Sequence, residues 1–302
     1  MKLTVKPEWD GFEIKRILFR ELGFSAGMVT RLKHMQDGIL LDGEYVGVRN
    51  KVSKGQTLSL HTEDTSSEAN EYILPVDLPV DILYEDVNVV CAGKPSGMPT
   101  IPTHGHRDDT LANALTYRYK DSGSVFVFRP VNRLDRETSG VVLVARNRLS
   151  AKKCGEELSA GGFEKTYIAV ICGTPEPRNG IVRGYIRREL PSIILRGFYE
   201  EGSESEYSET EYDVLYTNGK YSVVKLRPKT GRTHQLRVHM SHIGCPIIGD
   251  DLYGEKSELI GRTALHARSL TFTLPDGADK RITVESPIPE DMQTLIQTLK
   301  GN

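Results

Sequence analysis

Strand-sized apolar runs dominate the chain from about residue 82 onward, and they constrain its fold more than any other feature. The runs read VNVVCAGK, SGVVLVAR, KTYIAVICG and YSVVKLRP, and two stretches with helical spacing lie among them, TLANALTYRYK and SAKKCGEELS. Runs this short and this rich in valine and isoleucine favour strands over helices. This part of the chain is therefore predicted to mix helices and strands, an α+β arrangement built around a sheet.

The first segment of the chain, residues 1–64, follows a helical pattern instead. Apolar residues recur at helical spacing in EIKRILFREL and again in AGMVTRLKHM, and Ser25 stands where the N-cap of the second helix is expected. GILLDGEYV then predicts a hairpin that turns at Asp42 and Gly43, and KGQTLSL predicts another short strand. The segment is predicted to form a compact helix-helix-strand domain.

A polar, acidic stretch without apolar periodicity, HTEDTSSEANEY, separates the two patterns. This composition is typical of a solvated linker. We therefore expect domains at residues 1–64 and 78–302, joined by a linker over residues 65–77. The acidic segment YEEGSESEYSETEYD further along is expected to be an exposed loop or a sheet edge.

Bulk composition excludes several classes of protein. With 302 residues and 38% hydrophobic content the chain can build a real core, but no apolar stretch approaches the roughly 20 residues of a membrane-spanning helix. The four cysteines form no CxxC pair and no signal peptide is legible, so we expect reduced thiols and a cytoplasmic protein. No coiled-coil heptad is legible either, and a monomer is expected.

Basic residues gather locally although the formal net charge is only −2. Residues 225–245 hold five Lys or Arg and no Asp or Glu, and residues 129–153 hold seven basic residues against two acidic ones. If both segments line one cleft, that cleft would hold phosphates. The two N-terminal helices also carry basic residues, which are either solvated helix faces or contacts to a polyanion: Lys15, Arg16, Arg20, Arg31 and Lys33.

One aspartate, Asp135, stands between Arg133 and Arg136 in NRLDRETSG, directly ahead of an apolar run. A surface ion pair is the simpler interpretation of such a pattern. If the carboxylate is instead buried beside a guanidinium, it stays ionised at neutral pH, which suits a nucleophile or a base better than a general acid. Its place at the mouth of a predicted strand favours a functional role.

Several stretches of the chain resemble, in order, the motifs of the RluA-type RNA pseudouridine synthases. NRLDRETSG resembles their catalytic motif; the others are ILYEDVNVVCAGKPSGMPT, DDTLANAL, EKTYIAVICG, LRPKTGRTHQLRVHMSHIGCPIIGDDLYG and LHARSLTF. The N-terminal segment is similar to the alpha-L RNA-binding motif. The resemblance spans nearly everything except the linker and implies an α+β pseudouridine synthase fold, whose central sheet is mixed but mainly antiparallel.

The resemblance implies that the protein isomerises uridine to pseudouridine in RNA without a cofactor or a metal. By motif position it implies these roles: Asp135 as the essential carboxylate, Tyr167 as the catalytic ring that stacks on the uracil and helps to remove the carbon-5 proton, Arg232 as the partner that orients Asp135, Leu236 as an apolar floor, Thr138 as a further substrate contact, and Arg133 as the arginine that enters the space of the flipped nucleotide. The alpha-L similarity implies that the basic residues of the two N-terminal helices contact structured RNA. Ribosomal RNA of the large subunit is favoured as the substrate, with transfer RNA as the alternative.

The implied chemistry has physical needs that these residue types can meet. A base cannot rotate while it is stacked in RNA, so it must be flipped out and held by an aromatic ring and apolar groups. Hydrolytic glycosidases need two carboxylates because water enters and a leaving group departs, whereas here the base stays bound and one carboxylate can suffice. Whether that carboxylate attacks the ribose, attacks the uracil ring or acts as a base is left open by the sequence.

Each of these residues also has a simpler interpretation. Tyr167 alone would be a half-buried strand tyrosine, Arg232 a surface cation and Leu236 a core residue. A non-catalytic RNA-binding or assembly factor with a vestigial pocket is a rival class, and the intact aspartate, tyrosine and arginine argue against it. The histidines lack a fixed ligand spacing with cysteine or carboxylate, so no metal site is expected.

Two positions depart from the family pattern. Asn132 stands where relatives usually carry histidine, and Cys245 stands where histidine is frequent. Asparagine can still donate and accept hydrogen bonds, so activity is expected to survive this change.

Overall fold

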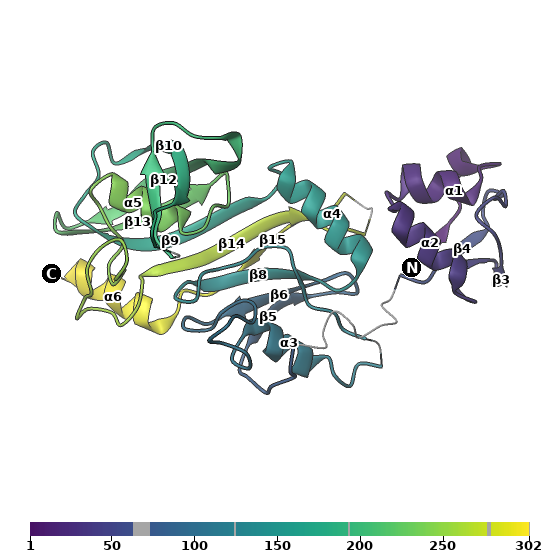
Figure 1. The fold of residues 1–302 in the computed structure, drawn as a ribbon, viewed down its shortest axis with the longest axis horizontal. Helices are drawn as coiled ribbons and strands as arrows, with labels where there is room; N and C mark the ends of the chain where they lie inside the picture. The colour runs from purple at the N-terminus through teal and green to yellow at the C-terminus, as the bar shows by residue number, and fades with distance from the viewer. Residues whose placement is uncertain (63–72, 124, 193, 277–278, 302) are drawn as a thin grey trace.

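The computed structural model describes residues 1–62, 73–123, 125–192, 194–276 and 279–301. Its strands form a small sheet near the N-terminus and a large sheet that runs through much of the remaining chain (Figure 1). The predicted domain limit at residue 64 and residues 65–72 of the predicted linker lie outside the described residues. The end of the predicted linker is described, and there Leu74 and Val76 are hydrogen-bonded to Asn113 of helix α3 (Leu111–Arg118).

The N-terminal unit, residues 1–62, combines two helical segments with a four-stranded sheet in the order β1-β4-β2-β3. Its elements are β1 (Lys2–Thr4), the 3-10 turn η1 (Pro7–Trp9), α1 (Ile14–Arg16), the π-helical η2 (Ile17–Glu21), α2 (Ala26–His34), β2 (Ile39–Leu41), β3 (Glu44–Tyr45) and β4 (Thr57–Leu60). Both predicted helices are confirmed, and the first continues as η2 with wider turns. Strand β1 was not predicted, because three residues are too few to show an alternation.

Local signals in the sequence explain where these elements begin and turn. Ser25 caps α2, because its hydroxyl oxygen accepts the backbone N–H of Met28 at 3.3 Å. The β2–β3 hairpin turns at Asp42 and Gly43, whose φ angles of 52° and 92° lie in the left-handed region that such a turn requires. The predicted cap and the predicted hairpin are therefore both confirmed.

The larger unit, residues 73–301, is built on an eleven-stranded sheet with the path β11-β10-β12-β13-β9-β14-β8-β6-β5, to which β15 and β7 add at β14 and β8. Its strands are β5 (Asp81–Glu85), β6 (Val89–Lys94), β7 (Arg129–Pro130), β8 (Ser139–Ala145), β9 (Glu164–Cys172), β10 (Asn179–Arg188), β11 (Arg196–Tyr199), β12 (Tyr207–Thr217), β13 (Tyr221–Pro228), β14 (Leu265–Thr273) and β15 (Arg281–Glu285). Its other helical elements are α4 (Arg148–Ser159), η4 (Glu204–Glu206), α5 (Gln235–His242) and α6 (Glu290–Gly301). The pair β8–β14 is parallel and the other described pairs are antiparallel, which confirms the mixed, mainly antiparallel sheet.

Strands β8, β14 and β9 form the centre of this sheet. The start of β8 runs parallel to β14, and β9 lies on the other side of β14. Gly140 lies where β8 and β14 approach each other: its φ is +120°, and a Cβ built there would lie only 2.2 Å from the carbonyl oxygen of Ala267. Only glycine fits at this position, and the close approach brings the loop before β8 next to β9.

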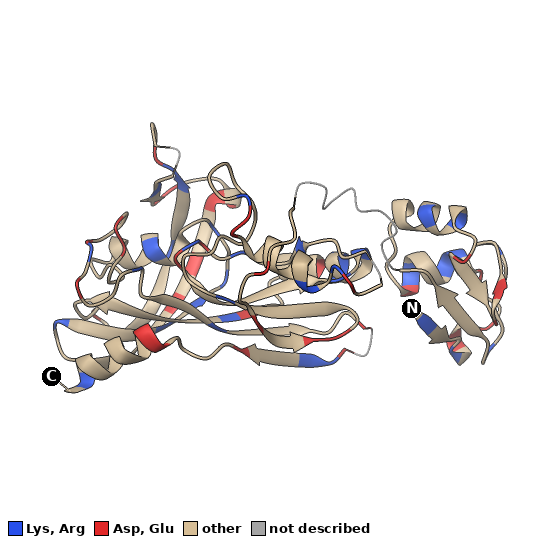
Figure 2. Cartoon of the chain, turned by 90° about the horizontal axis from the view of Figure 1, so that it is seen from below, with Lys and Arg blue, Asp and Glu red and all other residues tan. Residues whose placement is uncertain are grey.

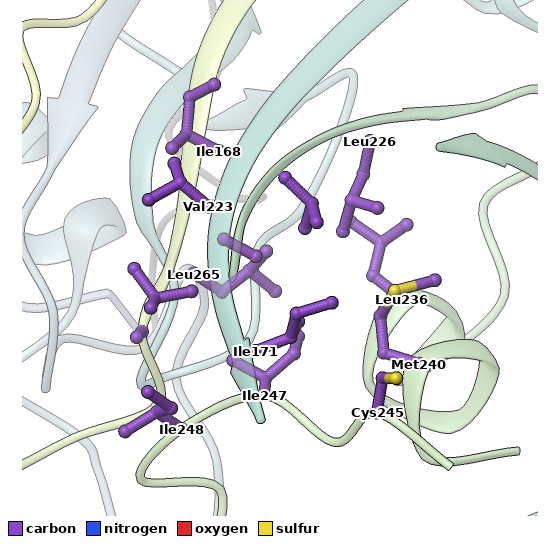
Figure 3. Close-up of a cluster of buried hydrophobic side chains, with 14 of the residues drawn as sticks. Ile168, Ile171, Val223, Leu226, Leu236, Met240, Cys245, Ile247, Ile248 and Leu265 are labelled. Carbon is purple, nitrogen blue, oxygen red and sulfur yellow. The ribbon is translucent and has the colours of Figure 1, made fainter. Parts of the chain in front are cut away.

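The largest core cluster joins α5 to β9 and β13. Figure 3 shows Leu236, Met240 and Cys245 packed against Ile171 and Leu226 of the sheet. Cys245 is buried in this apolar cluster, where a small, apolar side chain fits.

Two further features differ from simple expectation. The acidic segment expected at an exposed loop or edge contributes η4 and then β12, which is paired on both sides, with β10 and β13. Helix α4 contacts the N-terminal unit: Leu149 packs into its core, and Nζ of Lys152 donates to the carbonyl oxygen of Gly23. The N-terminal unit is therefore docked through α4.

Candidate active site

The loop between β7 and β8 carries Asp135, and the side chain of Asn132 ties this loop to β8. Its Nδ2 donates to the carbonyl oxygen of Val141 at 3.2 Å, and its Oδ1 accepts from the backbone N–H of Leu143 at 2.7 Å. The asparagine that departs from the family pattern thus uses both its donor and its acceptor to hold the loop. This agrees with the expectation that asparagine can serve at this position.

A buried lysine, Lys94 at the end of β6, supports the same loop. Its Nζ donates to the carbonyl oxygens of Pro95, Met98 and Arg136 at 2.8, 2.6 and 3.1 Å. Burial lowers the pKa of Lys94 to about 7, and the negative charge of Asp135 opposes this shift. Sequence reasoning missed this residue. The available signal was its position at the end of an apolar strand run. A lysine buried there needs hydrogen-bond partners, because lysine is seldom fully buried without them.

A cavity of about 820 Å³ opens between this loop, strand β9 and the start of α5. Parts of both predicted basic segments lie in it, together with Lys165 of β9. All six residues predicted for catalysis or substrate binding line this cavity: Asp135, Tyr167, Arg232, Arg133, Leu236 and Thr138. Residues that are far apart in the sequence are thus brought to one place by the centre of the sheet.

The carboxylate of Asp135 faces Arg237 and His234. Its Oδ2 lies 3.8 Å from Nη1 of Arg237 and 4.0 Å from Nε2 of His234. Arg232 was expected to orient Asp135, but its Nε donates to the carbonyl oxygen of Tyr207 at 2.9 Å. The expectation for Arg232 is therefore corrected. Arg232 lies in the loop before α5 and bonds to the neighbouring strand β12, whereas Arg237 lies inside α5 and faces the aspartate.

Arg237 supplies the positive charge next to the aspartate. It is 5% exposed, so its interaction with Asp135 is little screened by solvent. Burial lowers the pKa of His234, against the opposing effect of Asp135, so this imidazole is neutral at pH 7. The resulting site pairs one carboxylate with one buried guanidinium, as a nucleophile or base requires.

Tyr167 forms an aromatic wall of the cavity. In β9 it lies between Leu226 of β13 and Ala267 of β14, and it is half-buried. Burial raises the pKa of Tyr167, and the charge of Asp135 raises it further, so the phenol stays protonated at neutral pH. A neutral aromatic ring next to a carboxylate suits stacking on a flat base.

The remaining predicted substrate residues differ in their exposure. Leu236 and Thr138 are 6% and 3% exposed and form buried parts of the cavity wall, whereas Arg133 is an exposed residue at its rim. An apolar floor and an exposed cation at the opening are compatible with the roles expected for Leu236 and Arg133.

The five basic residues predicted to contact RNA lie on the helical segments of the N-terminal unit, remote in sequence from the cavity. Lys15 and Arg16 are in α1, Arg20 is in η2, and Arg31 and Lys33 are in α2. Figure 2 shows Lys and Arg positions in blue on the helices of the N-terminal unit. All except the half-buried Arg31 are exposed. They do not join the cavity and form a separate basic surface.

Two properties of the described residues bear on the class of site. No helix within them is long and apolar enough to span a membrane. Within the same residues, no three or more His, Cys, Asp or Glu side chains are grouped so that they could hold a metal ion.

Sequence comparison identifies the family. The family described as RNA pseudouridylate synthase matches residues 88–242. YjbO, an uncharacterized RNA pseudouridine synthase of Bacillus subtilis, is 34% identical over 92% of this chain and 96% of its own length. Ribosomal large subunit pseudouridine synthase D of Xanthomonas campestris pv. campestris is 34% identical over 86% of this chain and 81% of its own length.

Solved structures agree with this assignment. The structure of human RNA pseudouridylate synthase domain containing 1 is similar, with a TM-score of 0.56 and 26% identity over 74% of this chain and 96% of that one. Human RNA pseudouridylate synthase domain containing 4 shares the fold, with a TM-score of 0.59 and 24% identity over 72% of this chain and 92% of that one. The chain therefore belongs to the RluA-type RNA pseudouridine synthases and is an isomerase that acts on uridine in RNA.

Proposed function

We propose that this enzyme modifies uridine in ribosomal RNA of the large subunit and that Asp135 is its catalytic carboxylate. The observation that carries the proposal is the meeting of Asp135, Tyr167 and Arg237 in one cavity. Relatives named ribosomal large subunit pseudouridine synthase D, among them those of Xanthomonas campestris pv. campestris and Pseudomonas aeruginosa, are 34% and 32% identical and support the choice of RNA. Transfer RNA is the alternative substrate.

The proposed reaction needs no external reactant. The bond between uracil N1 and ribose C1′ breaks, the base turns, and a bond between C5 and C1′ forms, while C5 loses a proton and N1 gains one. Asp135 acts on the nucleotide through its carboxylate group. Tyr167 stacks on the flipped uracil, and Leu236 and Thr138 close the buried side of the pocket. Arg237 orients Asp135.

The remaining basic residues are assigned to the RNA backbone. Arg133 at the rim enters the space that the flipped nucleotide leaves, and Arg232 adds positive charge to the same cavity. A second contact to RNA is formed on the N-terminal unit by Lys15, Arg16, Arg20, Arg31 and Lys33. This unit acts as an RNA-binding domain of about residues 1–64, ahead of a catalytic domain at residues 78–302. We place the reaction in the cytoplasm, where the RNA is found.

The test is a comparison of pseudouridine maps of cellular RNA from cells that carry the wild type, no protein, or the variant Asp135→Asn. We expect one or more large-subunit rRNA positions to be modified only by the wild type, and RNA affinity of the variant to stay near the wild-type value, because only a charge at the reacting centre is lost. A site confined to transfer RNA would replace the proposed substrate. Unchanged modification by Asp135→Asn would refute the catalytic role of this residue.

A further inference from the structure

Asp250 lies outside the cavity, in the turn that follows Ile247, and forms a bidentate ion pair with Arg237. Its Oδ2 accepts from Nε of Arg237 and its Oδ1 accepts from Nη2, both at 2.6 Å. Asp250 is fully buried, at 0% exposure. Asp250 is not among the described residues that line the cavity, and neither is Tyr253, which follows it in the same turn.

This bidentate pair fixes the direction of the guanidinium. Because Nε and Nη2 are both held by Asp250, the group that remains for Asp135 is Nη1, which lies 3.8 Å from Oδ2 of Asp135. At that separation the guanidinium attracts Asp135 without closing a hydrogen bond on it. The lone pairs of the Asp135 carboxylate therefore stay available for the nucleotide.

The same carboxylate also shapes the turn that supports the second neighbour of Asp135. Oδ1 of Asp250 accepts from the backbone N–H groups of Leu252 and Tyr253, each at 3.1 Å. The hydroxyl group of Tyr253 lies 2.8 Å from Nδ1 of His234, whose Nε2 faces Asp135 at 4.0 Å. Both side chains that face Asp135 are thus held from one buried aspartate.

We propose that Asp250 is a positioning residue of the isomerisation, which acts through Arg237 and prevents this arginine from pairing fully with Asp135. The proposal rests on the proposed role of Asp135. Without Asp250, Asp135 would be the remaining carboxylate next to the buried guanidinium of Arg237. The guanidinium would then turn toward Asp135 and pair with it, and Asp135 would no longer be available to the substrate.

The experiment measures single-turnover pseudouridine formation and RNA affinity separately, on ribosomal RNA from cells that lack the protein. For Asp250→Asn we expect the rate constant to fall by about 100-fold, as for a misplaced reacting group, with Kd for RNA within about twofold of wild type. Asp250→Glu retains the negative charge on a longer side chain and is expected to be slower than wild type but faster than Asp250→Asn. If Asp250→Asn does not fold, a wild-type rate for Asp250→Glu overturns the proposal.

A matched control separates positioning from general stabilisation. Asp291 makes a similar bidentate pair with Arg262, at 2.6 and 2.9 Å, and neither residue lines the cavity. Asp291→Asn is expected to lower the melting temperature but to leave the rate constant per folded molecule within about twofold of wild type. An equal loss of rate in Asp291→Asn and Asp250→Asn would mean that Asp250 has only a structural role.

A double-mutant cycle tests the route through Arg237. If Asp250 acts through this arginine, Arg237→Lys with Asp250→Asn is no slower than Arg237→Lys alone. Independent, multiplying losses would overturn the route. If the wild type forms no pseudouridine in this RNA, both the proposed function and this inference are overturned. If the wild type is active and Asp250→Asn is equally fast, only this inference is overturned.

Discussion

At the scale of single residues, the position of an arginine in the fold decides whether it contacts Asp135. Arg232 and Arg237 lie five residues apart in one basic segment, yet only Arg237 is buried next to Asp135. Asn132 and Cys245 depart from the family pattern without disturbing the site, because one bonds to β8 and the other fills the apolar core. The chemical type of a residue therefore predicted less than its place in the fold.

The role of Tyr167 can be tested by two substitutions. Tyr167→Phe keeps the flat ring and is expected to retain most of the turnover. Tyr167→Ala removes the stacking surface and is expected to lower kcat/KM by about 5- to 150-fold relative to Phe, because stacking on a base contributes about 1–3 kcal/mol.

Tyr221→Ala is the control for this comparison, because Tyr221 is another half-buried strand tyrosine that packs against the same core cluster. It should cost stability without a selective loss of turnover. Equal kcat/KM for Tyr167→Phe and Tyr167→Ala would contradict the stacking role.

At the scale of elements, the proposed function assigns separate parts of RNA recognition to the N-terminal helices and to the central strands. Helix α4 connects them, because Leu149 is buried in the N-terminal core. Removal of the whole N-terminal unit would therefore uncover an apolar surface on α4. Charge removal on the exposed helix faces is the cleaner test.

The triple variant Lys15→Gln, Arg20→Gln and Lys33→Gln is expected to weaken RNA binding and to reduce its dependence on salt. Each lost phosphate contact should lower the slope of log K against log salt by about 0.7 to 0.9. Equilibrium RNA binding between low and physiological salt measures this slope.

The matched variant Lys256→Gln, Lys280→Gln and Lys300→Gln changes the total charge by the same amount at exposed positions outside the N-terminal unit. It should leave the slope near the wild-type value. If the two triple variants shift the slope equally, the N-terminal helices make no specific contact with RNA.

At the scale of the whole molecule, two buried histidines link folding to pH. His239 is 0% and His266 is 1% exposed, and burial lowers the pKa of each to about 4 from an ordinary value of 6.5. Between these values the unfolded chain binds protons that the folded protein does not bind. The contribution of the two histidines to stability is therefore fully present above pH 6.5 and is lost as the pH decreases toward 4, by about 3 kcal/mol for each histidine.

Urea unfolding at pH 7.5 and pH 5 measures this effect. His239→Gln is expected to reduce the loss of stability between the two pH values, because the amide can still bond to Ser208 but does not titrate. His104→Gln, at an exposed histidine, should leave the loss unchanged. A loss as large in His239→Gln as in the wild type would contradict the assignment.

Much of the fold was legible because its signals are local. The strand runs of β6, β8, β9 and β13, the helices α3 and α4, the cap at Ser25 and the turn at Asp42 each depend on a few neighbouring residues. Strand β1 and the interior place of β12 were missed, since pairing with a distant strand, and not local pattern, makes them strands.

The sequence by itself determined the family, many of the helices and strands, and six of the residues that line the cavity, because motif order and periodicity are written along the chain. Only the tertiary structure decided which arginine faces Asp135, that Lys94 supports its loop, and that Asp250 holds Arg237 from outside the cavity. These facts depend on distances between β6, β8, α5 and the turn at residue 250. Such distances arise only when the strands and helices pack together, because the direction of a buried guanidinium is set by its partners and not by its neighbours in sequence.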